Sequence, residues 1–364
     1  MIMRWLLLLT PMALLLRSVE ASPTLVFLVS LAAIVPLVEF MGTATERLAS
    51  RFGPVIGGLL NSTLTNAPEF IIGMVALSNG LSSVVKASLT GSILVNLLVG
   101  LGAALLVGGL KHGHSRFDRK RLKTSGSMLL MCGCCFIVPA VFRLGAPGAN
   151  RGLSEELSFI FLAIYVMNVF VNLVGRKDDS ITPEGREDLV DPAIPTWRPT
   201  AALVVGACGL ALVSDALAEA LVPTARSLGL SDTFSGIVLL GGVGGVGEVF
   251  TAVRFARAGR HELVLAATVG STIQMVLLVA PLLVLSGIAM GEPMNLCFSV
   301  FEVVAIVLAI FLAREIISDG RTTWIEGFLL LATYVILAFG FYHIPDAAIL
   351  STVSTASSLL PGES

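Results

Sequence analysis

Two glutamates lie inside apolar stretches of the chain, and each ends a run of small and polar residues. They are Glu69 and Glu248. The two runs read Gly57-Gly-Leu-Leu-Asn61-Ser-Thr-Leu-Thr65-Asn66-Ala-Pro68-Glu69 and Leu239-Leu-Gly241-Gly-Val-Gly244-Gly245-Val-Gly247-Glu248. A carboxylate surrounded by hydroxyl and amide groups can bind a hard cation such as Ca²⁺, which prefers oxygen ligands. The alternative interpretation is a pair of protonated carboxylic acids that are hydrogen-bonded inside a helix bundle.

The two glutamates belong to an internal repeat. A Gly-Ser pair follows each of them at the same distance, because Gly91 lies 22 residues after Glu69 and Gly270 lies 22 residues after Glu248. A polar residue then stands about one helical turn after each serine. Matching residues at matching intervals are the signature of a repeated structural unit. We therefore expect one shared ion site, with a path lined by Asn66, Ser92, Asn96, Ser271 and Gln274.

Both glutamates also follow a sequence that interrupts a helix. Pro68 lacks a backbone N–H and clashes with the preceding turn, and the glycines from 241 to 247 weaken the second helix at the equivalent place. Such breaks free backbone carbonyl groups, which persist at membrane depth only where a polar partner satisfies them. Broken helices around a midplane ion site are typical of secondary transporters.

The composition indicates whether the protein around these residues lies in water or in a lipid bilayer. Hydrophobic residues make up 55% of the 364 residues, charged residues only 13%, and mean hydropathy is +0.91. Soluble domains average about 25% charged residues. Because roughly 20 apolar residues span the hydrocarbon and a helix satisfies its own backbone there, the sequence predicts an all-α polytopic membrane protein. The apolar blocks fall at 24–43, 54–78, 83–109, 126–143, 155–175, 199–220, 232–255, 262–288, 294–314 and 323–343.

These ten blocks form two sets of five, separated by an acidic, proline-containing linker at 177–198. Because each set contains an odd number of helices, the second set must insert upside down relative to the first. We therefore predict two inverted five-helix repeats, at 23–176 and 199–345. Residues 1–22 precede them as a short apolar segment that is either an extra helix or a signal peptide, and residues 346–364 form a tail.

Basic residues predict which side of the bundle faces the cytoplasm. The connections on the side of the 111–123 loop collect 18 of the 23 Lys and Arg residues, and the opposite connections carry five. By the positive-inside rule, this loop and the acidic linker are cytoplasmic, so the basic loop requires no nucleic-acid partner. We expect a multi-pass protein of the lipid bilayer, most simply of a bacterial plasma membrane. The sequence leaves open whether it forms a homo-oligomer.

The motifs resemble those of the calcium/cation–proton antiporter family, in the calcium/cation antiporter superfamily. The family's first motif reads Gly-Asn-Ala-Pro-Glu and its second reads Gly-Asn-Ala-Ala-Glu-His, and the likeness covers residues 24 to about 343. The resemblance implies that Glu69 and Glu248 bind Ca²⁺ and exchange it for protons, helped by the backbone carbonyls of Thr65 and Gly244. The departures from the motifs include Thr65 in place of glycine, Gly245 in place of asparagine, Gly247 in place of alanine and Val249 in place of histidine.

The preferred hypothesis is a transporter rather than an enzyme, because the sequence shows no HExxH, Ser/Lys or paired-aspartate protease pattern. Such a transporter would exchange Ca²⁺, or another cation, for protons by alternating access and would need no cofactor. Two alternatives remain open. One is an exchanger of Na⁺ or Mn²⁺ with the same fold, and the other is a cation-binding membrane protein that does not transport.

The predicted topology can be checked by labelling cysteines from each side of the membrane. After removal of the five native cysteines, single cysteines in the 111–123 loop and the 177–195 linker should react from the cytoplasmic side, because both follow the basic-residue bias. A cysteine in the 144–153 loop should react only from the other side. Reaction of the 111–123 and 144–153 loops from one side would contradict the ten-helix interpretation.

Overall fold

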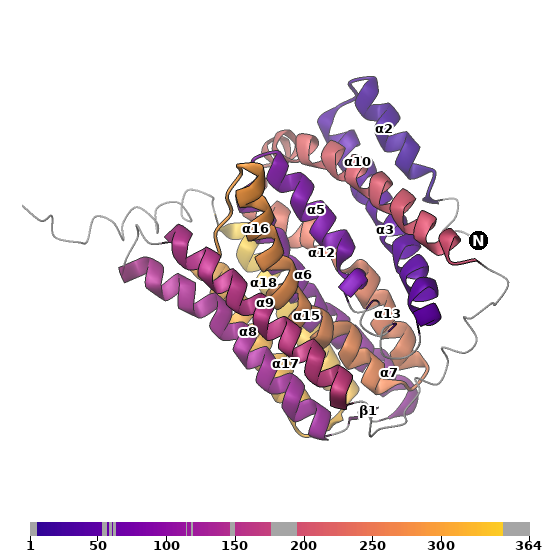
Figure 1. Ribbon diagram of the computed structural model, residues 1–364, viewed down its shortest axis with the longest axis vertical. Coiled ribbons are helices and arrows are strands. Elements are labelled where there is room, and N and C mark those ends of the chain that lie inside the picture. Colours follow the sequence, from indigo (N-terminus) through magenta and orange to yellow (C-terminus); the bar gives the residue numbers. More distant parts are fainter. Residues whose placement is uncertain are drawn as a thin grey trace, which may run out of the picture.

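The protein is a bundle of helices that differ widely in length (Figure 1). The computed structural model describes residues 6–52, 57, 60, 63–113, 115–117, 119–145, 150–175 and 195–344. Up to residue 175 the helical segments are α2 (Leu9–Ser18), α3 (Pro23–Ala49), η1 (Ser50–Phe52), α5 (Ala67–Ser78), α6 (Ser82–Leu94), η2 (Val95–Gly100), α7 (Leu101–His112), α8 (Arg119–Gly145) and α9 (Asn150–Gly175).

The later part of the chain is equally helical but is divided into shorter pieces. It contains α10 (Trp197–Leu228), α11 (Asp232–Phe234), η5 (Ser235–Leu240), α12 (Gly241–Gly244), α13 (Val246–Arg257), α14 (His261–Leu265), η6 (Ala266–Gly270), α15 (Ser271–Gln274), η7 (Met275–Val279), α16 (Ala280–Met290), α17 (Val300–Ser318) and α18 (Trp324–His343). Two short strands, β1 (Ser115–Arg116) and β2 (Arg321–Thr322), pair antiparallel.

Each of the ten apolar blocks contains helix. Among the described residues, seven helices are long and apolar enough to cross a membrane: Pro23–Phe52, Ser82–His112, Leu122–Phe142, Gly152–Val171, Trp197–Leu228, His261–Met290 and Trp324–His343. The pair Ser235–Gly244 and Val246–Arg257, bent by 49°, adds an eighth. The all-α polytopic fold is therefore confirmed.

The exact number of spans stays a prediction. Of the two remaining blocks, α5 has only 12 residues, and α17 has 19 residues but carries three charged side chains, at Glu302, Arg314 and Glu315. The start of the second block, including Asn61, lies outside the described residues. So do residues 177–194 of the predicted linker and the whole predicted tail, 346–364.

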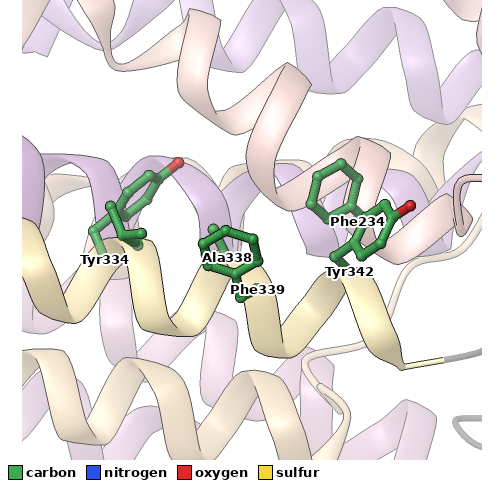
Figure 2. A pocket seen from close by; sticks show the side chains of 6 residues that line it. Phe234, Tyr334, Ala338, Phe339 and Tyr342 are labelled. Atoms are coloured by element: carbon green, nitrogen blue, oxygen red, sulfur yellow. The ribbon is translucent and has the colours of Figure 1, made fainter.

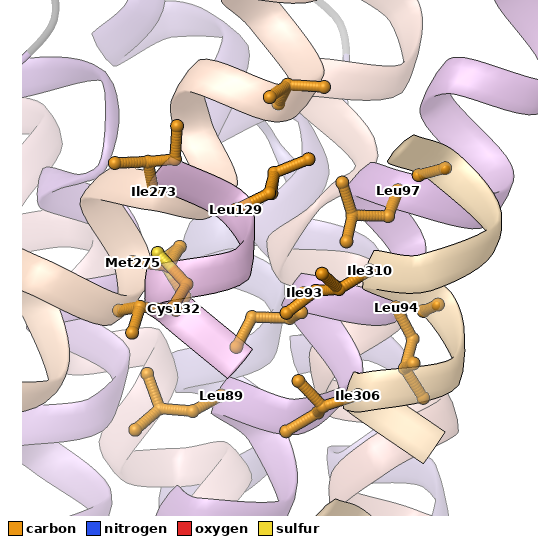
Figure 3. Close-up of a cluster of buried hydrophobic side chains, with 14 of the residues drawn as sticks. Leu89, Ile93, Leu94, Leu97, Leu129, Cys132, Ile273, Met275, Ile306 and Ile310 are labelled. Carbon is orange, nitrogen blue, oxygen red and sulfur yellow. The ribbon is translucent and has the colours of Figure 1, made fainter. Parts of the chain in front are cut away.

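The buried side chains form two clusters. One joins α3 to α10, where Ile34, Leu210 and Leu217 are almost fully buried, and α2 packs against both helices. The other fills the rest of the bundle (Figure 3). Since lipid tails are as apolar as leucine, these side chains stabilise the bundle by close packing rather than by leaving water. Figure 3 labels Leu89, Ile93, Leu94, Leu97, Leu129, Cys132, Ile273, Met275, Ile306 and Ile310 from α6, η2, α8, α15, η7 and α17.

A crossing of two glycines fixes α6 against η5 and α12. A Cβ atom at Gly91 would overlap the backbone carbonyl oxygen of Ile237, and a Cβ at Gly241 would lie 2.5 Å from the Cα of Gly91. No other residue type lets the two backbones approach so closely. The crossing matters for the site because Ser92 follows Gly91 directly and Gly244 lies one turn after Gly241.

Contacts between connections show which helix ends lie together. The β1–β2 pair joins the segment after α7 to the turn between α17 and α18, and Lys111 Nζ donates a hydrogen bond to the carbonyl of Arg257 at 2.8 Å. Three of the connections predicted to share a side therefore meet. Elsewhere, Arg17 of α2 lies 2.8 Å from Asp215 Oδ2 of α10. The N-terminal apolar block thus contains a helix that packs on the bundle.

Substitution at the crossing should destabilise the fold. In Gly91→Ala the new methyl group meets a backbone carbonyl, which cannot turn aside as a flexible side chain can, so we expect a loss of about 1–3 kcal/mol or more. The melting temperature of the purified protein in detergent measures this loss. Gly242→Ala is the matched control, because nothing lies within 4 Å of a Cβ at that position. Equal melting temperatures for the two variants would contradict the assigned crossing.

Candidate cation site

Helix breaks place the two glutamates at equivalent points. Asn66 precedes α5 with φ −91° and ψ 9°, and Gly245 precedes α13 with φ −80° and ψ 0°. Glu69 and Glu248 are then the third residues of their helices and lie in the first turn. The N-terminus of a helix carries the positive end of its dipole, so both positions stabilise negative charge.

The helices α5 and α13 lead away from these breaks toward different ends of the bundle (Figure 1). After the C-terminus of α5, Asn79 donates a hydrogen bond to Asp215 Oδ1 at 3.0 Å, close to Arg17. The last residue of α13, Arg257, accepts its bond from Lys111. The N-termini therefore meet inside the bundle, where each helix presents one glutamate.

The carboxyl groups of Glu69 and Glu248 contact each other. The two residues are 7% and 4% exposed, and their carboxyl groups lie close enough to interact directly. Two carboxyl groups can share a hydrogen bond only if one of them carries a proton. One oxygen of each group, Oε2 in both, has no hydrogen-bond partner among the described residues. The pair is therefore able to hold protons and still presents oxygens that a cation could use.

Glycine and serine bring the backbone of α12 close to this pair. A Cβ at Gly244 would lie 3.1 Å from Ser92 Oγ and 3.7 Å from Glu69 Cγ, so a larger side chain here would press on both. The Ser92 hydroxyl donates to the carbonyl of Gly241 at 3.5 Å. The Gly91–Gly241 crossing thus places the Ser92 hydroxyl group and the end of α12 close to Glu69.

The side chain of Asn66 connects the first helix break to α15. Its amide nitrogen donates to Gln274 Oε1 at 2.6 Å, and its Oδ1 accepts a hydrogen bond from Ser271 Oγ at 2.8 Å. Ser271 begins α15 and Gln274 ends it. The first broken helix is therefore bound to the Gly-Ser segment of the later repeat, more than 200 residues away.

The remaining candidate residues lie beside the same breaks. Thr65 is the last helical residue before the turn at Asn66 and is half-buried. Asn96, in η2, is 1% exposed, and its Oδ1 lies 3.4 Å from the place that a Cβ at Gly245 would take. The structure thus brings all nine predicted residues to the two breaks and their immediate surroundings.

The other intramembrane acids have partners of their own. Glu46 contacts Arg254 at 3.4 Å, and both Asp215 and Glu219 pair with Arg17. Glu302 caps the start of α17, where its Oε2 accepts the N–H of Ser299 at 2.8 Å, and its Oε1 accepts a bond from Thr90 at 3.4 Å. Each of these four acids therefore has an ion pair or a hydrogen bond.

Sequence reasoning missed the partner of Gly245. A Cβ at Gly245 would lie only 2.7 Å from Val95 Cγ1, so Val95 already fills the space beside the glycine. The sequence carries no signal of this contact, because the two residues are 150 positions apart and both are unremarkable in an apolar helix. Val249, where the family motif has histidine, is half-buried and lies 3.7 Å from a Cβ built at Gly100.

A surface groove of about 250 Å³ lies along α18 (Figure 2), and none of the candidate site residues lines it. In Figure 2 the aromatic rings of Phe234, Phe339 and Tyr342 gather beside one stretch of α18. The groove has no charged lining residue and is no cation site. Its lining residues are Phe234, Tyr334, Val335, Ala338, Phe339 and Tyr342.

Comparison with known proteins shows that this chain is similar to cation exchangers. Residues 22–174 and 198–343 match the model of the family described as sodium/calcium exchanger protein. A protein of Synechocystis sp. named Ca²⁺/H⁺ antiporter is 37% identical over 341 residues, which cover 88% of this chain and 92% of that protein. The structure of native YfkE matches with a TM-score of 0.83 at 32% identity, over 94% of this chain and 100% of that one.

A more distant structure shares the fold alone. That of the H⁺/Ca²⁺ exchanger CAX has a TM-score of 0.71 at 15% identity and covers 98% of each chain.

The packing of Val95 on Gly245 generates a prediction about the divergent motif. Gly245→Asn should destabilise the protein by about 1–3 kcal/mol, because the new Cβ meets a stiff β-branched side chain. The double variant Gly245→Asn with Val95→Ala should recover most of this loss, and thermal unfolding in detergent measures both. If the double variant were no more stable than Gly245→Asn alone, the two residues would not share one space.

Proposed function

Because this chain belongs to the sodium/calcium exchanger protein family, we propose that it is an antiporter that exchanges Ca²⁺ for protons at Glu69 and Glu248. One observation carries the proposal, namely that two buried carboxyl groups contact each other where two helix N-termini meet. The choice of ions is supported by the relative from Synechocystis, which is named a Ca²⁺/H⁺ antiporter.

The coupling of Ca²⁺ to protons follows from charge balance. Two ionised carboxylates in a water-poor interior cost much free energy unless positive charge compensates them. Ca²⁺ and protons can each supply this charge, and both bind to the carboxyl oxygens. Occupancy by one therefore excludes the other, and no separate coupling device is required.

The same groups suggest how the cation is held. Ca²⁺ takes six to eight oxygen ligands. Besides the glutamates, we assign this role to the carbonyls of Thr65 and Gly244. Side-chain oxygens of Ser92, Asn96 and Ser271 complete the set, whereas Asn66 and Gln274 mainly orient it through their hydrogen bonds.

Transport further requires that the site open to each side of the membrane in turn. We propose that the five-helix repeats at 23–176 and 199–345 are the inverted units that make this alternation possible, because each contributes one broken helix and one glutamate. The membrane is expected to be a bacterial plasma membrane, in line with bacterial relatives.

The divergent second motif gives a specific reason to test other cations. Gly245 and Val249 supply neither an amide nor an imidazole beside Glu248, so the site offers fewer polar groups than the family motif. Proton flux in proteoliposomes should be measured with Ca²⁺, Mn²⁺ and Na⁺ in turn, with and without a pH gradient. If the protein exchanged Na⁺ but not Ca²⁺ for protons, its transported cation would differ from the proposed one.

Neutralising either glutamate should abolish exchange. In Glu69→Gln and Glu248→Gln an amide replaces a carboxylate, which removes charge that a desolvated divalent cation requires, and we expect Ca²⁺-driven proton flux to fall to background. Glu219→Gln, at the exposed ion pair with Arg17, should retain flux and serves as the control. If a folded variant of either glutamate kept wild-type transport, the two-carboxylate site would be wrong.

A further inference from the structure

The helical turn before the first break is bonded to α9, a helix that carries none of the predicted site residues. Thr63 lies in this turn, three residues before Asn66. Its Oγ1 lies 3.0 Å from the hydroxyl oxygen of Tyr165 in α9, and the two groups form a hydrogen bond in which either can donate. The two residues are 102 positions apart in the chain. A side chain of α9 therefore contacts the first break directly.

Tyr165 is buried, unlike the other tyrosines of the chain. The sequence contains three tyrosines, of which Tyr342 is exposed, Tyr334 is half-buried and Tyr165 is 6% exposed. The next residue of α9, Val166, is exposed on the outside of the bundle, so α9 turns Tyr165 inward. A buried phenol hydroxyl needs a hydrogen-bond partner, and Thr63 supplies it.

The turn that contains Thr63 needs such a bond because Pro68 interrupts the backbone ladder. In a continuous helix the N–H of residue 68 would bond to the carbonyl of residue 64, and proline has no N–H. A helix interrupted in this way bends, so the turn before the break can change its angle to α5 unless side chains hold it. Thr65, whose carbonyl we assign to the cation, lies in the same turn, two residues after Thr63.

Side chains hold the first break at two points. Asn66 is bonded to α15, and Thr63 is bonded to α9 through Tyr165. The second break differs, because residues 241–247 are only glycine and valine, whose side chains form no hydrogen bonds. The first break is therefore fixed by side-chain hydrogen bonds that the second break cannot form.

We propose that Tyr165 is a positioning residue of the candidate cation site, because its hydroxyl fixes the turn that presents the Thr65 carbonyl to the cation. The inference rests on the proposed function. Tyr165 acts through Thr63 and is not itself a ligand. Loss of its hydroxyl should therefore weaken the binding of Ca²⁺, whereas the carboxyl groups that bind the protons are unchanged.

The test measures Ca²⁺-driven proton flux in proteoliposomes that contain Tyr165→Phe, which lacks the hydroxyl and keeps the ring. The apparent KM for Ca²⁺ should rise roughly fivefold, as expected for one lost hydrogen bond, while maximal flux stays close to that of the wild type. Tyr334→Phe is the matched control, because it removes the same atom from a tyrosine that lines the groove on α18. A bond that only stabilised the fold would lower the maximal flux and leave the KM unchanged.

Variants of Thr63 test the same bond from its other end. Thr63→Val removes the hydroxyl at nearly constant volume and should raise the KM as Tyr165→Phe does, whereas Thr63→Ser keeps a hydroxyl and should retain the wild-type KM. The double variant Tyr165→Phe with Thr63→Val should have no higher KM than either single variant, because all three lack one and the same hydrogen bond.

Calorimetric titration of the purified proteins with Ca²⁺ separates this inference from the proposed function. If the wild type binds Ca²⁺ without exchanging it for protons, the proposed function fails, and weaker binding by Tyr165→Phe still supports the positioning role. If the wild type neither binds nor exchanges Ca²⁺, both fail.

If the wild type exchanges Ca²⁺ while Tyr165→Phe and Thr63→Val keep its KM, the inference is overturned and the function stands. Should Tyr165→Phe not fold, an equal KM for Thr63→Val and Thr63→Ser would overturn the inference in its place.

Discussion

The structure depends on one constraint: two carboxyl groups that are buried inside a membrane protein cannot both be ionised unless nearby positive charge compensates them. Glu69 and Glu248 contact each other and are almost completely buried. Neither lipid nor the surrounding apolar core can solvate them, so protons, helix N-termini and a cation are the available sources of compensation. Broken helices supply the second of these directly, because each break turns a helix N-terminus toward its own glutamate.

Small residues make this geometry possible. Gly91 and Gly241 let α6 cross α12 in backbone contact, which carries Ser92 to Gly244 and Glu69. The hydrogen bonds from Asn66 to α15 then connect the first break to the later repeat. Because these contacts join segments about 150 to 210 residues apart, the site can form only when the whole bundle has assembled.

The sequence predicts most helices, both glutamates and their polar neighbours, since apolar blocks, a proline and repeated spacing leave local signals. It does not predict which polar groups are paired. Asn66 and Asn96 look alike in the sequence, yet one is held by Ser271 and Gln274 and the other has an unpaired oxygen beside Gly245. Nor does it predict that Val95, an ordinary apolar residue, packs against Gly245, because helix packing decides that contact. The apolar blocks also do not determine the number of membrane spans, because α5 is short and α17 carries charged side chains.

The most direct measurement of the central claim is the number of protons released when Ca²⁺ binds. Purified protein can be titrated with Ca²⁺ by calorimetry in two buffers that differ in ionisation enthalpy, so that the heat difference reports the protons transferred. If Ca²⁺ and protons share the carboxyl oxygens of Glu69 and Glu248, binding must release protons, and affinity must weaken as pH falls. Tight Ca²⁺ binding with no proton release would contradict the account.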